Sequence, residues 1–195
     1  MGGPKLPEQE RCDAILAAAY QIALTEGLDA VTARRVATAA SISPGLVFFH
    51  FQSKEGLLQA LLDVLLDGTL DALTDPGLAE LAPWDRLERM VRGELERLAE
   101  YHAGVELLFA FYFSRRDTLF RDRIEASFGR YLEAFLPVCR EVAAEGRMSG
   151  SVSGDDLAAT VVALVQGASI QAIRNPADFR PEALLATVQA FRPTA

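Results

Sequence analysis

The stretch SISPGLVFFHFQSKEGLL, residues 41–58, decides how the rest of the chain is interpreted. It places Phe48, Phe49 and Phe51 around one of the two histidines of the sequence. A serine precedes a proline at one end and a lysine–glutamate pair at the other, which is typical of the starts of two helices. The three phenylalanines therefore belong either to a core or to a surface that contacts another molecule.

The composition indicates a well-packed protein without a membrane span. Half of the 195 residues are apolar, so one or two domains with a sizeable core are expected. The longest apolar runs stay well short of the ~20 residues that cross a bilayer, and the first residues lack an export signal. We expect a cytoplasmic protein with no membrane partner. Cys12 and Cys139 are too few and too distant for a disulfide framework or a zinc site, so we expect no metal and no cofactor.

The charge of the chain is unevenly distributed. The net charge of −8 argues against non-specific attraction to nucleic acid. Residues 1–55, however, carry 5 basic and 6 acidic side chains, whereas the remaining residues carry 14 and 21. A local charge of +2 arises between residues 30 and 55, from Arg34, Arg35, Lys54 and Glu55. A small positive patch on an acidic protein is compatible with a DNA reader.

Helical periodicity runs through the chain and no alternating strand pattern is found, so the fold class is all-α. Gly27 ends the first helix, and Thr32, Ser43 and Ser53 are placed to cap the next three. Pro137 is expected to kink a long helix. The predicted helices cover residues 8–26, 33–40, 44–51, 54–73, 83–102, 105–113, 118–145, 155–174 and 181–191, with loops over 74–77 and 146–154.

Two of the short helices have the layout of a helix-turn-helix. Residues 33–40, the turn 41–43 and residues 44–50 fit this geometry, in which the second helix enters the major groove of DNA. The apolar side chains expected to hold the two helices together are Val36, Ala37, Ala40, Ile42 and Val47.

Residues 27–55 carry a more specific resemblance. GLDAVTARRVA (27–37), ASIS (40–43), GLVFFHF (45–51) and SKE (53–55) resemble the N-terminal signature of the TetR family of bacterial transcriptional regulators, over about residues 11–62. The resemblance implies an all-α homodimer of about nine helices per subunit. A three-helix DNA-binding head, residues 1–53, would be joined by a long helix to a ligand-binding and dimerisation body, residues 54–195. The two heads would bind a palindromic DNA operator and repress transcription. A hydrophobic small-molecule effector, with or without an anionic group, would release the protein from the operator.

The resemblance also assigns residues to the DNA contact. The implied positions are Thr32, Arg34, Arg35, Ser43, Pro44, Gly45, Leu46, Phe48, Phe49, His50 and Lys54. Phe51 matches a buried position. Phe48 stands where many members have a tyrosine that reaches phosphate, and Ser41 replaces the commoner glycine, so a different turn conformation is expected. Because Pro44 and Leu46 replace polar residues, we expect thymine-methyl contacts, arginine contacts and DNA shape to supply much of the specificity.

The remainder of the chain offers weaker signals for an effector site. Residues 107–113 form its densest aromatic segment. These side chains either line an apolar pocket for an effector or are ordinary core residues. Arg115, Arg116, Arg121 and Arg123 could neutralise an anionic effector or form a solvated, salt-bridged face. The candidate effector residues are Trp84, Met90, His102, Phe109, Phe113, Phe128, Tyr131 and Phe135.

The helix over residues 157–168 is apolar on nearly every side and carries small residues that allow close approach, so it suits a subunit interface. Burial inside one subunit is the competing interpretation. The candidate interface residues are Ala159, Ala163, Gly167, Leu184, Val188 and Phe191.

No catalytic constellation is visible in the sequence. The two histidines lie far apart, and neither a glycine-rich phosphate loop nor a metal-ligand spacing occurs, so we predict that the protein is not an enzyme. The alternative to a DNA-binding regulator is a small-molecule-binding dimer whose head makes protein contacts.

Overall fold

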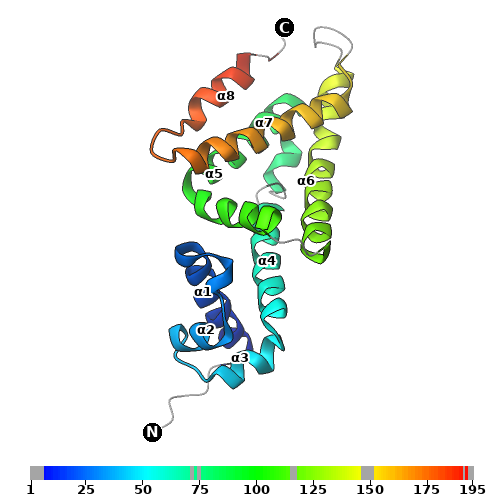
Figure 1. Cartoon of the computed structure of the whole chain (residues 1–195). Helices are drawn as coiled ribbons and strands as arrows, with labels where there is room; N and C mark the ends of the chain where they lie inside the picture. Colours follow the sequence, from blue (N-terminus) through cyan, green and yellow to red (C-terminus); the bar gives the residue numbers. More distant parts are fainter. Residues whose placement is uncertain are drawn as a thin grey trace. The chain divides into compact units, whose positions relative to one another are not determined.

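The computed structural model describes residues 7–70, 73, 76–114, 118–145, 152–190 and 192. Every regular element in these residues is a helix, which confirms the all-α prediction. The elements are α1 (Glu8–Glu26), η1 (Leu28–Ala30), α2 (Ala33–Ala39), α3 (Pro44–Phe51), α4 (Lys54–Leu70), η3 (Pro76–Glu80), α5 (Pro83–Ser114), α6 (Thr118–Ala144), α7 (Gly154–Arg174) and α8 (Pro181–Ala190) (Figure 1).

The predicted helix starts agree with the structure, and one cap works differently. Thr32 and Ser53 accept hydrogen bonds from the backbone nitrogens of Arg35 and Gly56, at 3.4 Å and 2.9 Å. Ser43 is the N-cap of α3, but its hydroxyl makes no capping bond. The backbone nitrogen of Leu46 instead donates to the carbonyl oxygen of Ser43 at 3.0 Å, so the amide that a side-chain cap would satisfy already has a partner.

The predicted division of residues 83–113 into two helices is confirmed. α5 (Pro83–Ser114) consists of two helices joined across a kink at Tyr101, where the backbone departs from helical values (φ −118°, ψ 26°). With α5 divided there, the eight α-helices of the described residues become nine, which agrees with the expected number. Two other predicted boundaries are wrong. α4 ends at Leu70 and not near residue 73, and residues 76–77, predicted as loop, begin the 3-10 helix η3.

Other predictions are not decided by the structure. α6 continues through Pro137, and the expected kink there stays a prediction. Residues 74–75, most of the loop over 146–154 and Phe191 lie outside the described residues.

The chain divides into two compact units. The first contains residues 1–65 and 107–121, and the second contains residues 66–106 and 122–195. The helices α4, α5 and α6 each contribute residues to both units. The domain limits predicted at residues 53 and 54 stay a prediction.

The first unit buries aliphatic side chains and two phenylalanines. α2 packs against both α1 and α3, and η1 packs against α1. Phe111 and Phe120 are fully buried and stack with ring centroids 5.6 Å apart. The buried side chains of the N-terminal helices are short or branched. They include Ile15, Ala19, Val31, Val36, Ala37 and Val47, each at most 4% exposed.

The second unit has one continuous hydrophobic core that contains residues from α5, α6, α7 and α8. Trp84, Leu87 and Val91 on α5 belong to it, as do Phe135 on α6 and Ala158 on α7. α8 is also tied to α5 by polar contacts, since the Gln189 amide donates to Glu88 at 2.7 Å. The buried face of α7 is therefore part of a core within one chain.

α7 is also long and apolar enough to cross a membrane, judged by length and composition alone. This is weak evidence, because a helix that packs in a protein core has the same length and composition. Leu157, Val161 and Val165 lie in the core of the second unit, which accounts for much of its apolar character.

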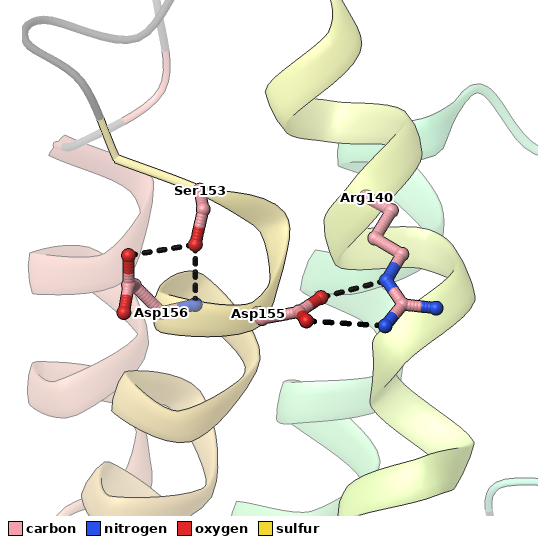
Figure 2. A network of polar contacts seen from close by, with 4 residues as sticks. All are labelled: Arg140, Ser153, Asp155 and Asp156. Carbon is pink, nitrogen blue, oxygen red and sulfur yellow. Dashed lines mark hydrogen bonds and ion pairs between the residues drawn. The ribbon is translucent and has the colours of Figure 1, made fainter.

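The start of α7 contacts α6 through an ion pair, which Figure 2 shows, and through the close approach of a glycine. The guanidinium of Arg140 on α6 donates to both carboxylate oxygens of Asp155, at 2.6 Å and 3.1 Å, and lowers the pKa of that carboxyl. The hydroxyl of Ser153 caps α7 through the backbone nitrogen of Asp156 and donates to the carboxylate of the same residue. A Cβ on Gly154 would lie 2.5 Å from Cα of Arg140, so the two backbones approach closely there. Because the ion pair is exposed, it adds little stability, and the close approach fixes the junction.

We predict that Gly154→Ala lowers the free energy of unfolding by about 1–3 kcal/mol, because the new methyl group meets backbone atoms that cannot move cheaply. Gly129→Ala on α6 is the matched control, since nothing lies within 4 Å of its added Cβ, and it should stabilise the helix by up to about 1 kcal/mol. Urea denaturation measures both variants. Equal stability of the two variants would contradict the close approach.

Candidate DNA interface and effector region

The recognition helix candidate, α3, is oriented by one buried side chain. Val47 is 2% exposed and is the only buried residue of the eight that form α3. With about 100° of rotation per residue, this places the opposite face in solvent. Pro44, Gly45, Phe48 and Phe49 are all exposed, with Phe48 at 59% and Phe49 at 72%. Two of the three phenylalanines of the opening stretch thus belong to a surface.

The third phenylalanine and Leu46 are half-buried. Phe51, which matches a buried position in the family resemblance, is thus covered only in part. It is the last residue of the short helix α3.

Both ends of α3 have left-handed backbone at residues other than glycine. Ser41 has φ of 56° and Gln52 has φ of 63°. This region favours glycine and costs most other residues about 1 kcal/mol or more. Ser41 thus adopts a conformation that suits a glycine, against our expectation of a different turn. The chain reverses sharply on each side of α3, and α3 is presented as a short, separate helix.

The start of α4 is fixed beside the end of α3. A Cβ on Gly56 would lie 2.1 Å from the carbonyl oxygen of Phe51, so only glycine permits this approach. Lys54 Nζ donates to the carbonyl oxygen of Asp29 at 2.9 Å, which anchors its half-buried side chain to η1. An ammonium has three donors, so the two that remain can contact phosphate.

The two arginines of α2 differ in their partners. Arg35 forms an ion pair with Glu26 of α1, and this lowers the pKa of the Glu26 carboxyl. The guanidinium of Arg34 is exposed and has no ion-pair partner among the described residues. Thr32, at the start of the same helix, accepts one bond and keeps its hydroxyl proton for donation. Arg34 is consequently better placed than Arg35 to bind phosphate.

His50 is occupied inside the protein. Its Nδ1 lies 3.5 Å from the Sγ atom of Cys12 on α1. Its Nε2 is buried without a hydrogen-bond partner in the part of the chain that the structure describes. Burial raises the pKa of the Cys12 thiol. Sequence reasoning did not pair these two residues, because 38 positions separate them and no local pattern links them.

The candidate effector residues fall into both compact units. Trp84, Met90, Tyr131 and Phe135 are buried in the core of the second unit. His102 and Phe128, also in that unit, are half-buried. In the first unit Phe109 and Phe113 stack with ring centroids 6.0 Å apart, and Phe113 is 73% exposed. Trp84 and His102 are 18 positions apart on α5, about 27 Å in an ideal helix, so they do not line one small pocket.

A buried carboxylate lies among these aromatic side chains. Glu94 is 5% exposed. It accepts hydrogen bonds from the hydroxyl of Tyr131 at 2.7 Å and from the guanidinium of Arg97 at 2.6 Å. Burial, and then the carboxylate of Glu94, raise the pKa of Tyr131 above its usual range. Sequence reasoning missed Glu94, although its place on the apolar stripe with Leu87, Met90 and Leu98 was a visible signal.

The candidate interface residues lie on the uncovered face of α7 and on α8. Ala159, Ala163 and Gly167 are exposed, and they recur every four residues on the side opposite the core. Leu184 and Val188 of α8 are half-buried. α7 is thus buried on one face within the chain and carries a row of small residues on the other, beside the exposed side chains of Thr160, Gln166 and Gln171.

Comparison with protein families finds two matches. Residues 15–61 match the family described as bacterial regulatory proteins, tetR family. Residues 83–192 match the family described as BetI-type transcriptional repressor, C-terminal. The two matches together include the whole of α2, α3, α5, α6, α7 and α8.

Individual proteins agree with the families. The chain is 27% identical over 138 residues to the HTH-type transcriptional regulator BetI of Serratia proteamaculans (strain 568), which is 70% of this chain and 68% of that protein. A crystal structure of a TetR-family transcriptional regulator from Rhodococcus sp. is 26% identical, with a TM-score of 0.70 over 94% of this chain and 98% of that one. AibR, solved with isovaleryl coenzyme A and operator DNA, has a TM-score of 0.72 at 17% identity, over 94% of this chain and 100% of its own.

Proposed function

This chain belongs to the TetR family of bacterial transcriptional regulators, and on that premise we propose that it is a cytoplasmic repressor. It binds a palindromic operator as a homodimer and leaves it when a hydrophobic effector binds. The observation that carries the proposal is α3, a short helix turned outward by Val47 within a helix-turn-helix.

The head divides the DNA contact between cations and α3. Arg34, Lys54 and the hydroxyl of Thr32 bind phosphates and set the register of the head on the duplex. Ser43, Pro44, Gly45 and Leu46, at the leading end of α3, approach the base edges, with Phe48 and Phe49 on the same exposed face. Arg35 contributes less, because Glu26 already neutralises it. His50 contributes by orienting α3, since both of its ring nitrogens face the protein.

We predict that Lys54→Met weakens binding to every DNA sequence and lowers the slope of log K against log salt by about one per head. The reason is the loss of one phosphate contact. A salt titration on fragments of the upstream region of its own gene measures the slope. Because Lys54 also bonds the Asp29 carbonyl, thermal melting must first establish that the variant is folded.

The matched control is Arg130→Met, which removes one exposed cation from α6 and should leave the slope unchanged. An unchanged slope in the folded Lys54 variant would refute its phosphate role. If the protein itself binds all fragments weakly and equally, the alternative of a head that makes protein contacts is supported in place of a repressor.

We propose that the uncovered face of α7, together with α8, forms the dimer interface. Ala159, Ala163 and Gly167 present a row of small side chains, which lets the same helix of a second subunit approach closely. Ile170, 42% exposed, extends the row. A row that can meet its own copy suits the two-fold symmetry of most homodimers and of a palindromic operator.

We predict that Ala163→Glu raises the dimer Kd by about a hundredfold or more, because burying an unpaired carboxylate costs about 3 kcal/mol. Sedimentation equilibrium at micromolar concentration measures the change. Ala126→Glu, at an exposed alanine of α6, is the control and should remain dimeric. Two variants with the same dimer Kd would place the interface elsewhere.

We propose that the effector binds in the second unit, near Met90, Tyr131 and Phe135. All three belong to one hydrophobic core, and Tyr131 bonds the buried Glu94, which also pairs with Arg97. Apolar surface with a few polar groups is the combination that small-molecule sites use. Trp84 Nε1 and His102 Nδ1 are buried without a hydrogen-bond partner in the described residues, and each could meet a polar end of a longer ligand. AibR, which shares the fold, was solved with an acyl thioester of coenzyme A, so this ligand class is the first to test.

We predict that an acyl coenzyme A thioester at a hundredfold excess over its Kd stabilises the protein by about 2.7 kcal/mol. This raises the Tm of a chain of this size by about 5–10 °C and should release the operator. Thermal shift and competition binding measure the two effects, and free coenzyme A is the control that separates the acyl group from the carrier. If neither Tm nor DNA binding responds to thioesters of any chain length, this class of effector is wrong.

A further inference from the structure

We propose that α3 reads the C5-methyl groups of pyrimidines in the major groove through Phe48 and Phe49. The operator then carries thymine opposite these side chains, and 5-methylcytosine is bound better than cytosine at the same positions. This inference rests on the proposed function, and it names the chemical feature of DNA that the head selects.

The rings of Phe48 and Phe49 are both exposed to solvent. Phe48 is 59% exposed and Phe49 is 72% exposed, whereas large apolar side chains are usually buried. Val47, between Leu46 and Phe48, occupies the inward position and is 2% exposed. The two rings therefore lie on the face of α3 that points away from α2, where a duplex would be held.

The exposed face of α3 lacks polar side chains. Between Ser43 at the start of α3 and Gln52 after its end, the exposed residues are Pro44, Gly45, Phe48 and Phe49. None of these four has a side-chain hydrogen-bond donor or acceptor. His50 would be the exception within the helix, but its Nδ1 faces Cys12 and its Nε2 is buried. The middle of α3 cannot read a base by side-chain hydrogen bonds.

The major groove presents one apolar group that an apolar helix face can contact. Of the groups on the edges of base pairs there, the C5-methyl group of thymine is the apolar one, and the others are hydrogen-bond donors and acceptors. A phenylalanine ring placed over a donor or acceptor would remove its water without replacing the hydrogen bond. Contact with a methyl group carries no such cost and buries apolar surface on both partners.

The charged groups supply affinity without competing for this choice. Arg34 on α2 is exposed, and Lys54 lies at the start of α4, so the cations of the head lie outside α3. Contacts between such cations and phosphates do not depend on sequence. Selection among bases consequently falls to the apolar face and to the serine and glutamine at its two ends.

5-Methylcytosine follows from the same chemistry. It carries its methyl group at the C5 position, as thymine does, and differs from thymine in the major groove by an amino donor at C4 in place of the oxygen acceptor. Phe48 and Phe49 have no polar group with which to detect that difference. A head of this kind responds to cytosine methylation at the contacted positions.

The experiment uses the full-length protein and duplexes enriched by it from a random pool. At each enriched pyrimidine, four versions of the duplex are compared: thymine, uracil, cytosine and 5-methylcytosine. Thymine and uracil differ by one methyl group, as do 5-methylcytosine and cytosine. Because burial of one methyl group is worth about a fourfold change in affinity, each methylated base should bind about fourfold more tightly than its partner.

Phe48→Ala and Phe49→Ala test whether the phenylalanines cause the preference. Both side chains are largely exposed, so the variants should fold, and each should lose the fourfold ratio at one position of each half-site. Phe49→Leu, which keeps an apolar contact, should retain part of the ratio. Val64→Ala removes apolar surface from a 54% exposed position on α4 and should keep the ratio in full.

The outcomes separate this inference from the proposed function. A specific sequence that is bound equally with and without its methyl groups refutes the reading of methyl groups and leaves the repressor intact. A methyl preference that survives in both Phe48→Ala and Phe49→Ala refutes the role of these residues. If no sequence is enriched at all, the repressor and the inference both fail.

Discussion

The burial of Val47 is the constraint on which the DNA-binding head depends. α3 has eight residues and one fully buried side chain, so the direction of that side chain fixes the rotation of the helix about its axis. With Val47 directed toward the core, Phe48 and Phe49 are exposed, at 59% and 72%. Ser41 before α3 and Gln52 after it have positive φ angles, so the backbone leaves the helical conformation on both sides of this short helix.

The polar groups of the head are largely used to hold it together. Cys12 and the ring of His50 meet between α1 and α3, Arg35 pairs with Glu26, and Lys54 bonds η1. What remains for a partner is an apolar face and a few donors at its edges. This division separates positioning from reading: internal polar contacts fix where α3 lies, and its outward side chains decide what it touches.

The sequence predicted helices well wherever a local signal marked both ends. α1, which ends before the glycine at position 27, and α3, which begins with Pro44, agree with the structure, because glycine and proline act on the backbone locally. The predicted break between residues 102 and 105 lies beside the kink of α5 at Tyr101. The buried group of Glu94, Arg97 and Tyr131 escaped prediction, because Tyr131 lies on another helix.

The sequence by itself determined the all-α fold, the helix-turn-helix and the family, because periodicity, caps and motif spacing are properties of neighbouring residues. Only the tertiary structure decided that Phe48 and Phe49 are exposed, that Arg35 is neutralised, and where the nitrogens of His50 point. Each of these depends on a partner many positions away: Cys12 for His50 and Glu26 for Arg35. The chemical type of a side chain limits the contacts that it can make. The packing of distant segments decides which of these contacts form.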